Sequence, residues 1–256
     1  MKDVNFDLNL AIDIGNSTVN IAFFENKDFI NSISLQTDQM IKGNFKIEKP
    51  KDFNKQIAKV EKAGISSVVP EATNKVIDFI QEQKNIKIYK IEELDYNIKI
   101  DYEGLLGEDR MMAILGAFKD YGIKNVVVDI GSALTFSVLD KDKVFRGGMI
   151  ALGPFNILRS STQNTSQLEN IKLHKPVANI GQNTESSLNS GIYWMIVGAI
   201  EKGIETIENE IGYKLGKILT GGGTDLVKDY FIEKNYILDR YLVVKGVNYL
   251  LLDNGV

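Results

Sequence analysis

Two segments of the chain share one pattern of apolar and polar positions. Each begins with an apolar run, at residues 9–15 and 125–131, that ends in the same Asp-Ile-Gly triplet. A small polar residue follows, Asn16 or Ser132, and a second apolar run then ends in a charged turn. Apolar runs on both sides of a turn that contains glycine predict a β-hairpin. We interpret the repeat as a duplicated ligand-binding unit, and the alternative is an ordinary turn made twice, since Asp and Gly are common turn residues.

A second correspondence supports the duplication. Residues 65–69 and 217–220 each read as a strand that leads through a turn into a helical pattern, at residues 76–83 and 226–231. Strands mixed with helices in each half predict an α/β protein.

Two longer helices are predicted, from about residue 107 to 121 and from about residue 184 towards 210. In these helices we interpret Trp194 and the methionines as core packing. The helix after the glycine triplet is expected to start with Thr224 or Asp225 as its N-cap.

Composition removes several classes of function. The chain has no cysteine, which excludes disulfides, zinc–thiolate sites and a thiol nucleophile. The single histidine, His174, lies in a polar stretch and is interpreted as a surface residue. The net charge of -4, with no run of Lys or Arg, argues against a nucleic-acid partner. Residues 1–7 lack an apolar signal region and no apolar stretch reaches about 18 residues, so we expect a cytoplasmic protein without a membrane partner.

Four clusters offer groups for chemistry. The turns at Asp13 and Asp129 present backbone amides and hydroxyls suited to phosphates, and Asp13 is also a candidate metal ligand. Glycines at 221–223 before a helix give bare backbone on which a planar ring can lie. Residues 107–110 open a helix, where simple capping is the alternative interpretation. The chain has neither the Gly-Lys-Ser/Thr of a Walker P-loop nor a Rossmann Gly-x-Gly-x-x-Gly after its first strand.

These clusters resemble the superfamily of sugar kinases, heat-shock chaperones and actin, and their order resembles the type III pantothenate kinase family. The family's Asp-x-Gly-Asn-Thr/Ser corresponds to residues 13–17, its Gly-x-Asp-Arg to 107–110, and its Asp-Phe-Gly-Thr-Ala-Thr-Thr to 129–135. Its later Gly-Gly-x-Ile-x-Pro-Gly, Ile-Gly-x-Asn-Thr and Thr-Gly-Gly motifs correspond to residues 147–153, 180–184 and 220–222. The resemblance therefore spans nearly the whole chain.

The chain departs from the family pattern at four positions. Ser132 replaces a Thr and keeps its hydroxyl, whereas Leu134 replaces a Thr and loses it. Leu152 stands where Pro is usual, and Glu108 replaces a small residue beside the aspartate of the Gly-x-Asp-Arg motif.

The resemblance implies two tandem ribonuclease-H-like (actin-like ATPase) domains, at residues 1–119 and 120–256, each a mixed β-sheet flanked by helices. It implies ATP-dependent phosphorylation of pantothenate to 4'-phosphopantothenate, the first step of coenzyme A biosynthesis. The implied cofactors are ATP, Mg²⁺ and a monovalent cation, K⁺ or NH₄⁺. Members of the family are cytosolic homodimers, so a homodimer is expected.

The resemblance also implies roles for individual residues. Asp109 would be the catalytic base, and Asp129 would bind the monovalent cation. Pantothenate would contact Tyr102, Gly107, Glu108, Asp109, Arg110 and Thr184. ATP would contact Asp13, Ile14, Gly15, Asn16, Ser17, Thr18, Val19, Asn20, Ser132, Gly221 and Gly222.

Two other functions stay open from the sequence. One is a non-catalytic or transcription-accessory paralogue of the same family that acts by binding alone. The other is an ATPase or phosphatase of the superfamily that uses water as its acceptor.

Overall fold

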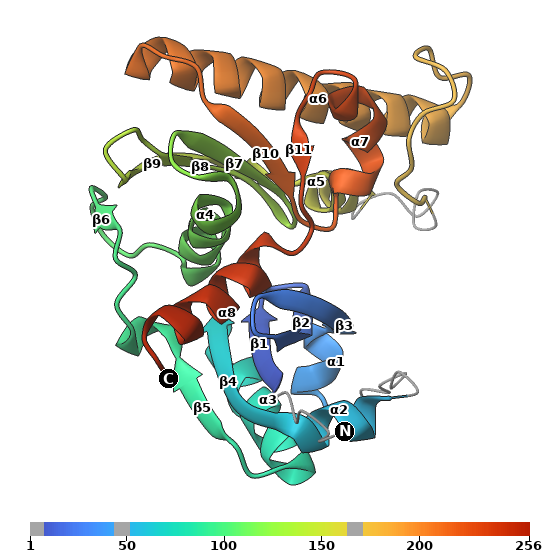
Figure 1. The fold of residues 1–256 in the computed structure, drawn as a ribbon. Coiled ribbons are helices and arrows are strands. Elements are labelled where there is room, and N and C mark those ends of the chain that lie inside the picture. The colour runs from blue at the N-terminus through green and yellow to red at the C-terminus, as the bar shows by residue number, and fades with distance from the viewer. Residues whose placement is uncertain (1–7, 44–51, 163–170) are drawn as a thin grey trace, which may run out of the picture. The chain divides into compact units, whose positions relative to one another are not determined.

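The chain divides into two compact units, and the computed structural model describes residues 8–43, 52–162 and 171–256 of it (Figure 1). Unit 1 comprises residues up to 97 together with 103–120 and 242–256, and unit 2 comprises 98–102 and 121–241. Each unit holds one mixed β-sheet, so the predicted α/β class is confirmed. The expectation that residues 1–7 contain no signal region concerns residues outside the described part of the chain.

The compact units do not follow a single cut in the sequence. The last helix of the chain packs in unit 1, and the short segment 98–102 packs in unit 2. The division into sequence domains 1–119 and 120–256 stays a prediction.

Unit 1 is built on a five-stranded sheet in the order β3-β2-β1-β4-β5. Strands β1, β2 and β3 are antiparallel neighbours, whereas β4 and β5 continue the sheet in parallel with β1. The strands are β1 (Leu8–Ile14), β2 (Thr18–Glu25), β3 (Asp28–Gln36), β4 (Val60–Ser67) and β5 (Lys87–Lys90). The helices are α1 (Thr37–Ile41), α2 (Phe53–Lys59), α3 (Pro70–Gln83), the 3₁₀ helix η1 (Ile91–Glu93), α4 (Glu108–Tyr121) and α8 (Leu242–Asp253).

Unit 2 repeats this sheet and adds one strand at its edge, in the order β11-β10-β7-β8-β9-β6. Strands β7, β8 and β9 are antiparallel neighbours, and β10 and β11 continue in parallel with β7. The strands are β6 (Lys99–Ile100), β7 (Asn125–Ile130), β8 (Ala133–Leu139), β9 (Val144–Leu152), β10 (Gly216–Thr220) and β11 (Ile237–Leu238). The helices are α5 (Pro154–Thr162), α6 (Thr184–Ile211) and α7 (Thr224–Ile232).

The two sheets have the same topology, which confirms the duplication predicted from the Asp-Ile-Gly turns. Both predicted hairpins are present, as β1–β2 and β7–β8. In each unit the parallel strand that follows leads directly into a helix, α3 or α7. Each sheet has its own core, because the alternating inward side chains of its central strands are fully buried.

The long helix α6 was predicted within one residue of its observed ends. The Asn183 side chain accepts a hydrogen bond from the Ser186 amide, and Gly212 ends the helix at a φ of +81°. These are the caps expected for Asn before a helix and for Gly after one.

Three local predictions were wrong. Helix α3 begins at Pro70 rather than near residue 76, because proline is well suited to the first helical position. The N-cap of α7 is Gly223, since Thr224 is already helical and its hydroxyl donates to the Gly221 carbonyl at 2.7 Å. Trp194 and Met195 are not core residues, with 41% and 47% of their surfaces exposed.

Helices α4 and α8 of unit 1 pack so closely that their backbones are in contact. A Cβ built on Gly116 would lie 2.3 Å from the Leu242 carbonyl oxygen, and one on Gly246 would lie 2.0 Å from that of Met112. Glycine at both positions therefore permits the crossing. Helix α8 was not predicted from the sequence, although its apolar face packs against β1 and β4.

Of the helices within residues 8–43, 52–162 and 171–256, none combines the length and the apolar composition that a bilayer crossing requires.

The α4–α8 crossing predicts a contrast between two glycine substitutions. Gly246→Ala should lower the free energy of unfolding by about 2 kcal/mol, because the new methyl group has no room against the α4 backbone. Gly198→Ala in α6 is the matched control, since its Cβ position has no described atom within 4 Å apart from its chain neighbours and its own helix backbone. There alanine should be neutral or stabilising by up to about 1 kcal/mol, from its helix propensity alone. Urea unfolding measures both, and equal effects would contradict the crossing.

Candidate active site

The Asp13 turn closes the β1–β2 hairpin at the carboxyl end of β1. The Gly15 amide donates to the Thr18 carbonyl at 2.9 Å, and the Thr37 hydroxyl donates to the Gly15 carbonyl at 2.7 Å. The Thr37 amide also donates to the Ser17 carbonyl at 3.0 Å, so the turn is tied to the start of α1. Asn16 lies exposed at the tip of this fixed turn. The turn thus presents polar groups in a preset arrangement, as an anion-binding site requires.

The carboxyl ends of β1 and β4 lie side by side, with Asp13 opposite Ser66 and Ile14 opposite Ser67. The Val68 amide donates to the Ile14 carbonyl at 3.1 Å. At the last residue of β4, the Ser67 amide donates to Glu108 Oε2 at 2.7 Å. The start of α4 therefore lies at the same edge of the unit 1 sheet as the Asp13 turn.

The first turn of α4 holds the proposed base in a fixed rotamer. Asp109 Oδ1 accepts the Arg110 amide at 2.7 Å, and a Cβ on Gly107 would come within 2.6 Å of the same oxygen. Glycine at 107 therefore leaves space for this carboxylate. Asp109 is half-buried, whereas Arg110 is only 7% exposed. A charged side chain is rarely buried to this extent unless its charge is paired.

A pocket of about 230 Å³ lies beside this helix start. Its lining is mostly polar and comes from β4, α3, the β5–η1 segment and α4: Ile65, Ser67, Pro70, Thr73, Asn74, Lys90, Glu92 and Glu108. Partial burial raises the pKa of Glu108 above its usual value, and the hydrogen bond from the Ser67 amide acts in the opposite direction. The negative charges of Glu92 and Asp109 add to the increase. The edge of the unit 1 sheet thus concentrates acidic groups next to the proposed base.

The Asp129 turn of unit 2 resembles the Asp13 turn but is one residue shorter between its strands. The Gly131 amide donates to the Ala133 carbonyl at 2.9 Å, and the Gly153 amide donates to the Ser132 carbonyl at 3.0 Å. The Asn156 side chain also donates to the Ser132 carbonyl, at 2.9 Å. The Ser132 backbone is therefore held from the start of α5.

Two glycine segments surround the Asp129 carboxylate. A Cβ on Gly221 would lie 2.1 Å from Asp129 Oδ1, and Gly221 has a φ of +89° that favours glycine. A Cβ on Gly131 would lie 3.5 Å from the same oxygen. The backbone of the 221–223 loop thus approaches this carboxylate as no other residue type would allow. Gly222 is exposed beside it, at the start of α7.

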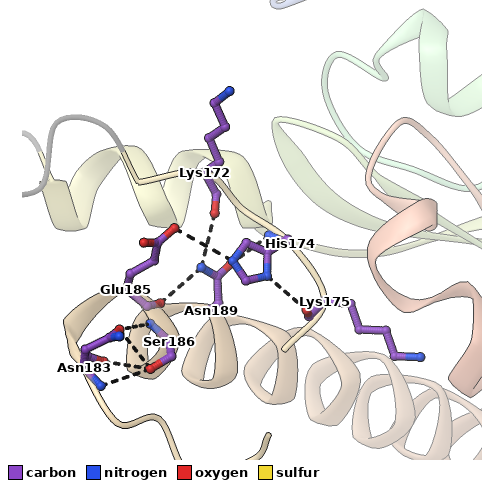
Figure 2. Close-up of polar contacts among 7 residues, drawn as sticks. All are labelled: Lys172, His174, Lys175, Asn183, Glu185, Ser186 and Asn189. Carbon is purple, nitrogen blue, oxygen red and sulfur yellow. Dashed lines mark hydrogen bonds and ion pairs between the residues drawn. The ribbon is translucent and has the colours of Figure 1, made fainter. Parts of the chain in front are cut away.

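Thr184 occupies the first turn of α6, where its side chain is exposed. Figure 2 shows how the surrounding segment is fixed: the buried Asn189 side chain accepts the His174 amide at 2.7 Å and donates to the Lys172 and Glu185 carbonyls. His174 lies 3.9 Å from the Glu185 carboxylate, and its side chain is 49% exposed. The prediction of a surface histidine is confirmed.

The predicted site residues fall into two groups. Unit 1 brings the Asp13 turn and the 107–110 helix start to one sheet edge, and unit 2 brings Asp129, Ser132 and the 221–222 loop together. Tyr102 and Thr184 also belong to unit 2. The sequence interpretation missed Thr37, which fixes the first turn from 22 residues away, because no local pattern marks such a contact.

The raised pKa of Glu108 predicts a pH-dependent effect of Glu108→Gln. Because its pKa is raised in the folded state, protonated Glu108 stabilises the folded parent protein. This stabilisation is fully present below the unfolded-state pKa of about 4.3 and is lost as pH rises through the higher folded-state pKa. Glutamine does not titrate and keeps an oxygen for the Ser67 amide. The stability of the variant relative to the parent should therefore increase as pH rises from about 4 through the folded-state pKa of Glu108.

Urea unfolding at several pH values measures this difference. Glu82→Gln, on the exposed face of α3, is the matched control. A difference for Glu108→Gln that is as flat with pH as the control would contradict the electrostatic description of the helix start.

Comparisons with known proteins identify the family. The family described as type III pantothenate kinase matches residues 9–206. The type III pantothenate kinase of Sulfurihydrogenibium sp. is 31% identical over 94% of this chain and 98% of its own length. That of Persephonella marina is 30% identical over 93% of this chain and 96% of its own length.

Solved structures agree with the fold. A protein from Campylobacter jejuni described as a Baf family transcriptional activator has a TM-score of 0.60 at 24% identity, covering 96% of this chain and 98% of that one. An archaeal actin homologue has a TM-score of 0.53 at 11% identity, covering 96% and 99%. These likenesses confirm the actin-like architecture of two similar mixed sheets, and the family match with its relatives shows more: this chain belongs to the type III pantothenate kinase family.

Proposed function

We propose that this chain transfers the γ-phosphoryl group of ATP to pantothenate and forms 4'-phosphopantothenate, the first step of coenzyme A biosynthesis. The observation that carries the proposal is the family match over residues 9–206, which includes both Asp-Ile-Gly turns and the 107–110 helix start. The hydrogen bond between Ser67 and Glu108 supports it, because it holds that helix start at the sheet edge of the Asp13 turn.

In this proposal Asp109 acts on the acceptor hydroxyl. The hydroxyl oxygen forms a bond to the γ-phosphorus, the bond to the bridging oxygen breaks, and ADP leaves with that electron pair. The hydroxyl proton passes to the Asp109 carboxylate. The short contact with the Arg110 amide supports this role, since it fixes the direction of the carboxylate before substrate arrives.

The remaining acceptor contacts follow the family resemblance. Gly107, Glu108 and Arg110 would line the acceptor side in unit 1, and Tyr102 and Thr184 would contribute from unit 2. The buried position of Arg110 supports its role, because a guanidinium there can neutralise a bound carboxylate with little loss of side-chain entropy.

The phosphates of ATP would be bound by the turn residues 13–20 and by Ser132, and the nucleoside by Gly221 and Gly222. Phosphoryl transfer needs positioning and charge stabilisation more than covalent chemistry. Turns held from α1 and α5 supply the positioning.

Two cations would complete the charge balance. Mg²⁺ would enter with ATP near Asp13, which accepts a hydrogen bond from the Asn20 side chain at 3.4 Å. K⁺ or NH₄⁺ would be held at Asp129, whose carboxylate lies against the glycine backbone at residue 221. Among the described residues no cluster of three acidic or histidine ligands exists, so both ions would take further oxygens from backbone, water or nucleotide. Bound there, they would neutralise phosphate charge.

The proposal also includes a homodimeric, cytoplasmic protein, as the family resemblance implies.

Two competing functions make different predictions for one assay of ADP release. A binding-only relative, or a transcription-accessory one, should release no ADP under any condition. A superfamily ATPase or phosphatase should release ADP equally with and without pantothenate. The kinase should release ADP only when pantothenate and a monovalent cation are both present.

Removal of the proposed base should abolish turnover without unfolding the chain. Asp109→Asn should lower kcat by about 10²–10⁴-fold, the usual contribution of a general base. Asp78→Asn on the exposed face of α3 is the matched control and should keep full activity. Near-normal pantothenate phosphorylation by Asp109→Asn, with an unchanged circular dichroism spectrum in both variants, would remove Asp109 from the mechanism.

The cation site predicts a separable effect. Asp129→Asn should raise the half-activating K⁺ concentration by about tenfold, because loss of a contacting charge corresponds to about 1.4 kcal/mol. The KM for pantothenate should change much less. Asp142→Asn, an exposed aspartate of the same unit, serves as the control. A K⁺ titration that is identical for Asp129→Asn and the control would place the monovalent cation elsewhere.

A further inference from the structure

Tyr102 lies two residues after the edge strand β6 of unit 2, and the pairing of this strand with the sheet is weak by itself. β6 has two residues, both exposed, and pairs in parallel with Val144 and Phe145 of β9. The Asp101 amide adds one more hydrogen bond, to the Phe145 carbonyl at 3.0 Å. A ladder this short at a sheet edge is expected to open readily unless side chains hold it.

Two ion pairs that share one arginine hold this ladder in place. Arg146 Nη1 lies 2.5 Å from Asp101 Oδ2, and Arg146 Nε lies 2.6 Å from Asp140 Oδ2. One guanidinium therefore joins the residue before Tyr102 to a carboxylate in the turn between β8 and β9. A guanidinium held by two carboxylates has its direction fixed, unlike a single exposed ion pair.

The inner carboxylate of these ion pairs is built into the fold. The Asp140 side chain is 6% exposed and accepts the Asp142 amide at 2.8 Å and the Val144 amide at 2.9 Å. Although burial acts in the opposite direction, these amides and Arg146 hold the pKa of Asp140 below its usual value. Asp140 is thus a charged anchor at neutral pH.

The ring of Tyr102 is held on two sides. It meets the buried Phe145 ring edge to face, at 5.9 Å between centroids and 73° between planes. Tyr102 Cδ2 would lie 3.1 Å from a Cβ on Gly147, whose φ of +84° favours glycine. The ring therefore lies on bare backbone, where a larger residue would displace it.

We propose that Asp101, Arg146 and Asp140, together with Gly147, form a clamp that positions the Tyr102 ring and so sets the affinity of this chain for its acceptor. The proposal rests on the proposed function, in which Tyr102 contacts pantothenate. Asp101, Arg146 and Asp140 are positioning residues, since they act through Tyr102. The clamp lies wholly within unit 2, so its contacts stand without reference to unit 1.

Asp101→Ala tests the clamp, because Asp101 is the exposed end of the two ion pairs and its loss leaves Asp140 paired with Arg146. The variant should raise the KM for pantothenate by about tenfold, within the usual range for coupled neighbours. The KM for ATP and kcat should change less than about twofold. Glu205→Ala, which breaks an exposed ion pair with Lys202 within α6, is the matched control and should change neither constant.

A double-mutant cycle separates positioning from general destabilisation. In a Tyr102→Ala background, Asp101→Ala should have no further effect on the KM for pantothenate, because the ring that it positions is gone. An equal increase in both backgrounds, or no increase in the Tyr102-containing protein, would overturn the clamp.

Hydrogen exchange gives a readout that does not depend on the reaction. The amides of residues 100–102 should exchange faster in Asp101→Ala than in the parent, whereas Glu205→Ala should leave them unchanged. If the parent shows no pantothenate-dependent ADP release, the proposed function fails while the exchange experiment still tests the clamp. Unchanged exchange in Asp101→Ala would overturn the clamp whatever the activity.

Discussion

The parallel register of β1 with β4 is the constraint on which the arrangement of unit 1 depends. It sets Ile14 opposite Ser67, so that the Asp-Ile-Gly turn and the end of β4 finish at the same level. The Ser67 amide at this end of β4 then donates a hydrogen bond to the Glu108 carboxylate. A shift by one residue would turn every side chain of the strand to the other face and would remove this amide from reach. The position of Asp109 relative to the Asp13 turn is therefore a consequence of strand pairing.

The same scaffold places different groups beside its turn in the second copy. Both Asp-Ile-Gly turns are fixed by an amide from the segment that follows the third strand, Thr37 in one case and Gly153 in the other. Among the described residues, a glycine loop approaches the carboxylate of the second turn, where Gly221 lies close to Asp129. The first turn instead has an acidic helix start beside it. Duplication thus preserves the backbone of the turn and leaves its surroundings free to differ.

Features that depend on residues close together in the sequence were predicted, whereas features that depend on residues far apart were not. The hairpins and the long helix α6 were predicted well, because alternation, turn residues and helical periodicity are local signals. Helix α8 was missed, since it packs with strands more than 170 residues away in the sequence. Trp194 was assigned to the core because a large apolar residue usually lies there, yet its ring lies at the surface between Tyr193 and Tyr230.

The candidate site shows the same limit. The residues of the 13–17 and 107–110 motifs were named from sequence, but the hydrogen bond that joins their neighbourhoods was not, because Ser67 and Glu108 are 41 residues apart. Likewise, Tyr102 was predicted as a site residue from the sequence, but the ion pair that holds its segment was not predicted. The Arg146–Asp101 pair spans 45 residues and follows no spacing rule.

The central claim is that the γ-phosphoryl group of ATP reaches an organic hydroxyl and not water. Phosphorus NMR of a reaction that contains the parent protein, ATP, Mg²⁺, K⁺ and pantothenate tests it most directly. A new phosphomonoester signal that grows in proportion to ADP, and is absent without pantothenate, is the predicted result. Growth of inorganic phosphate in its place, at the same rate with and without pantothenate, would contradict the account.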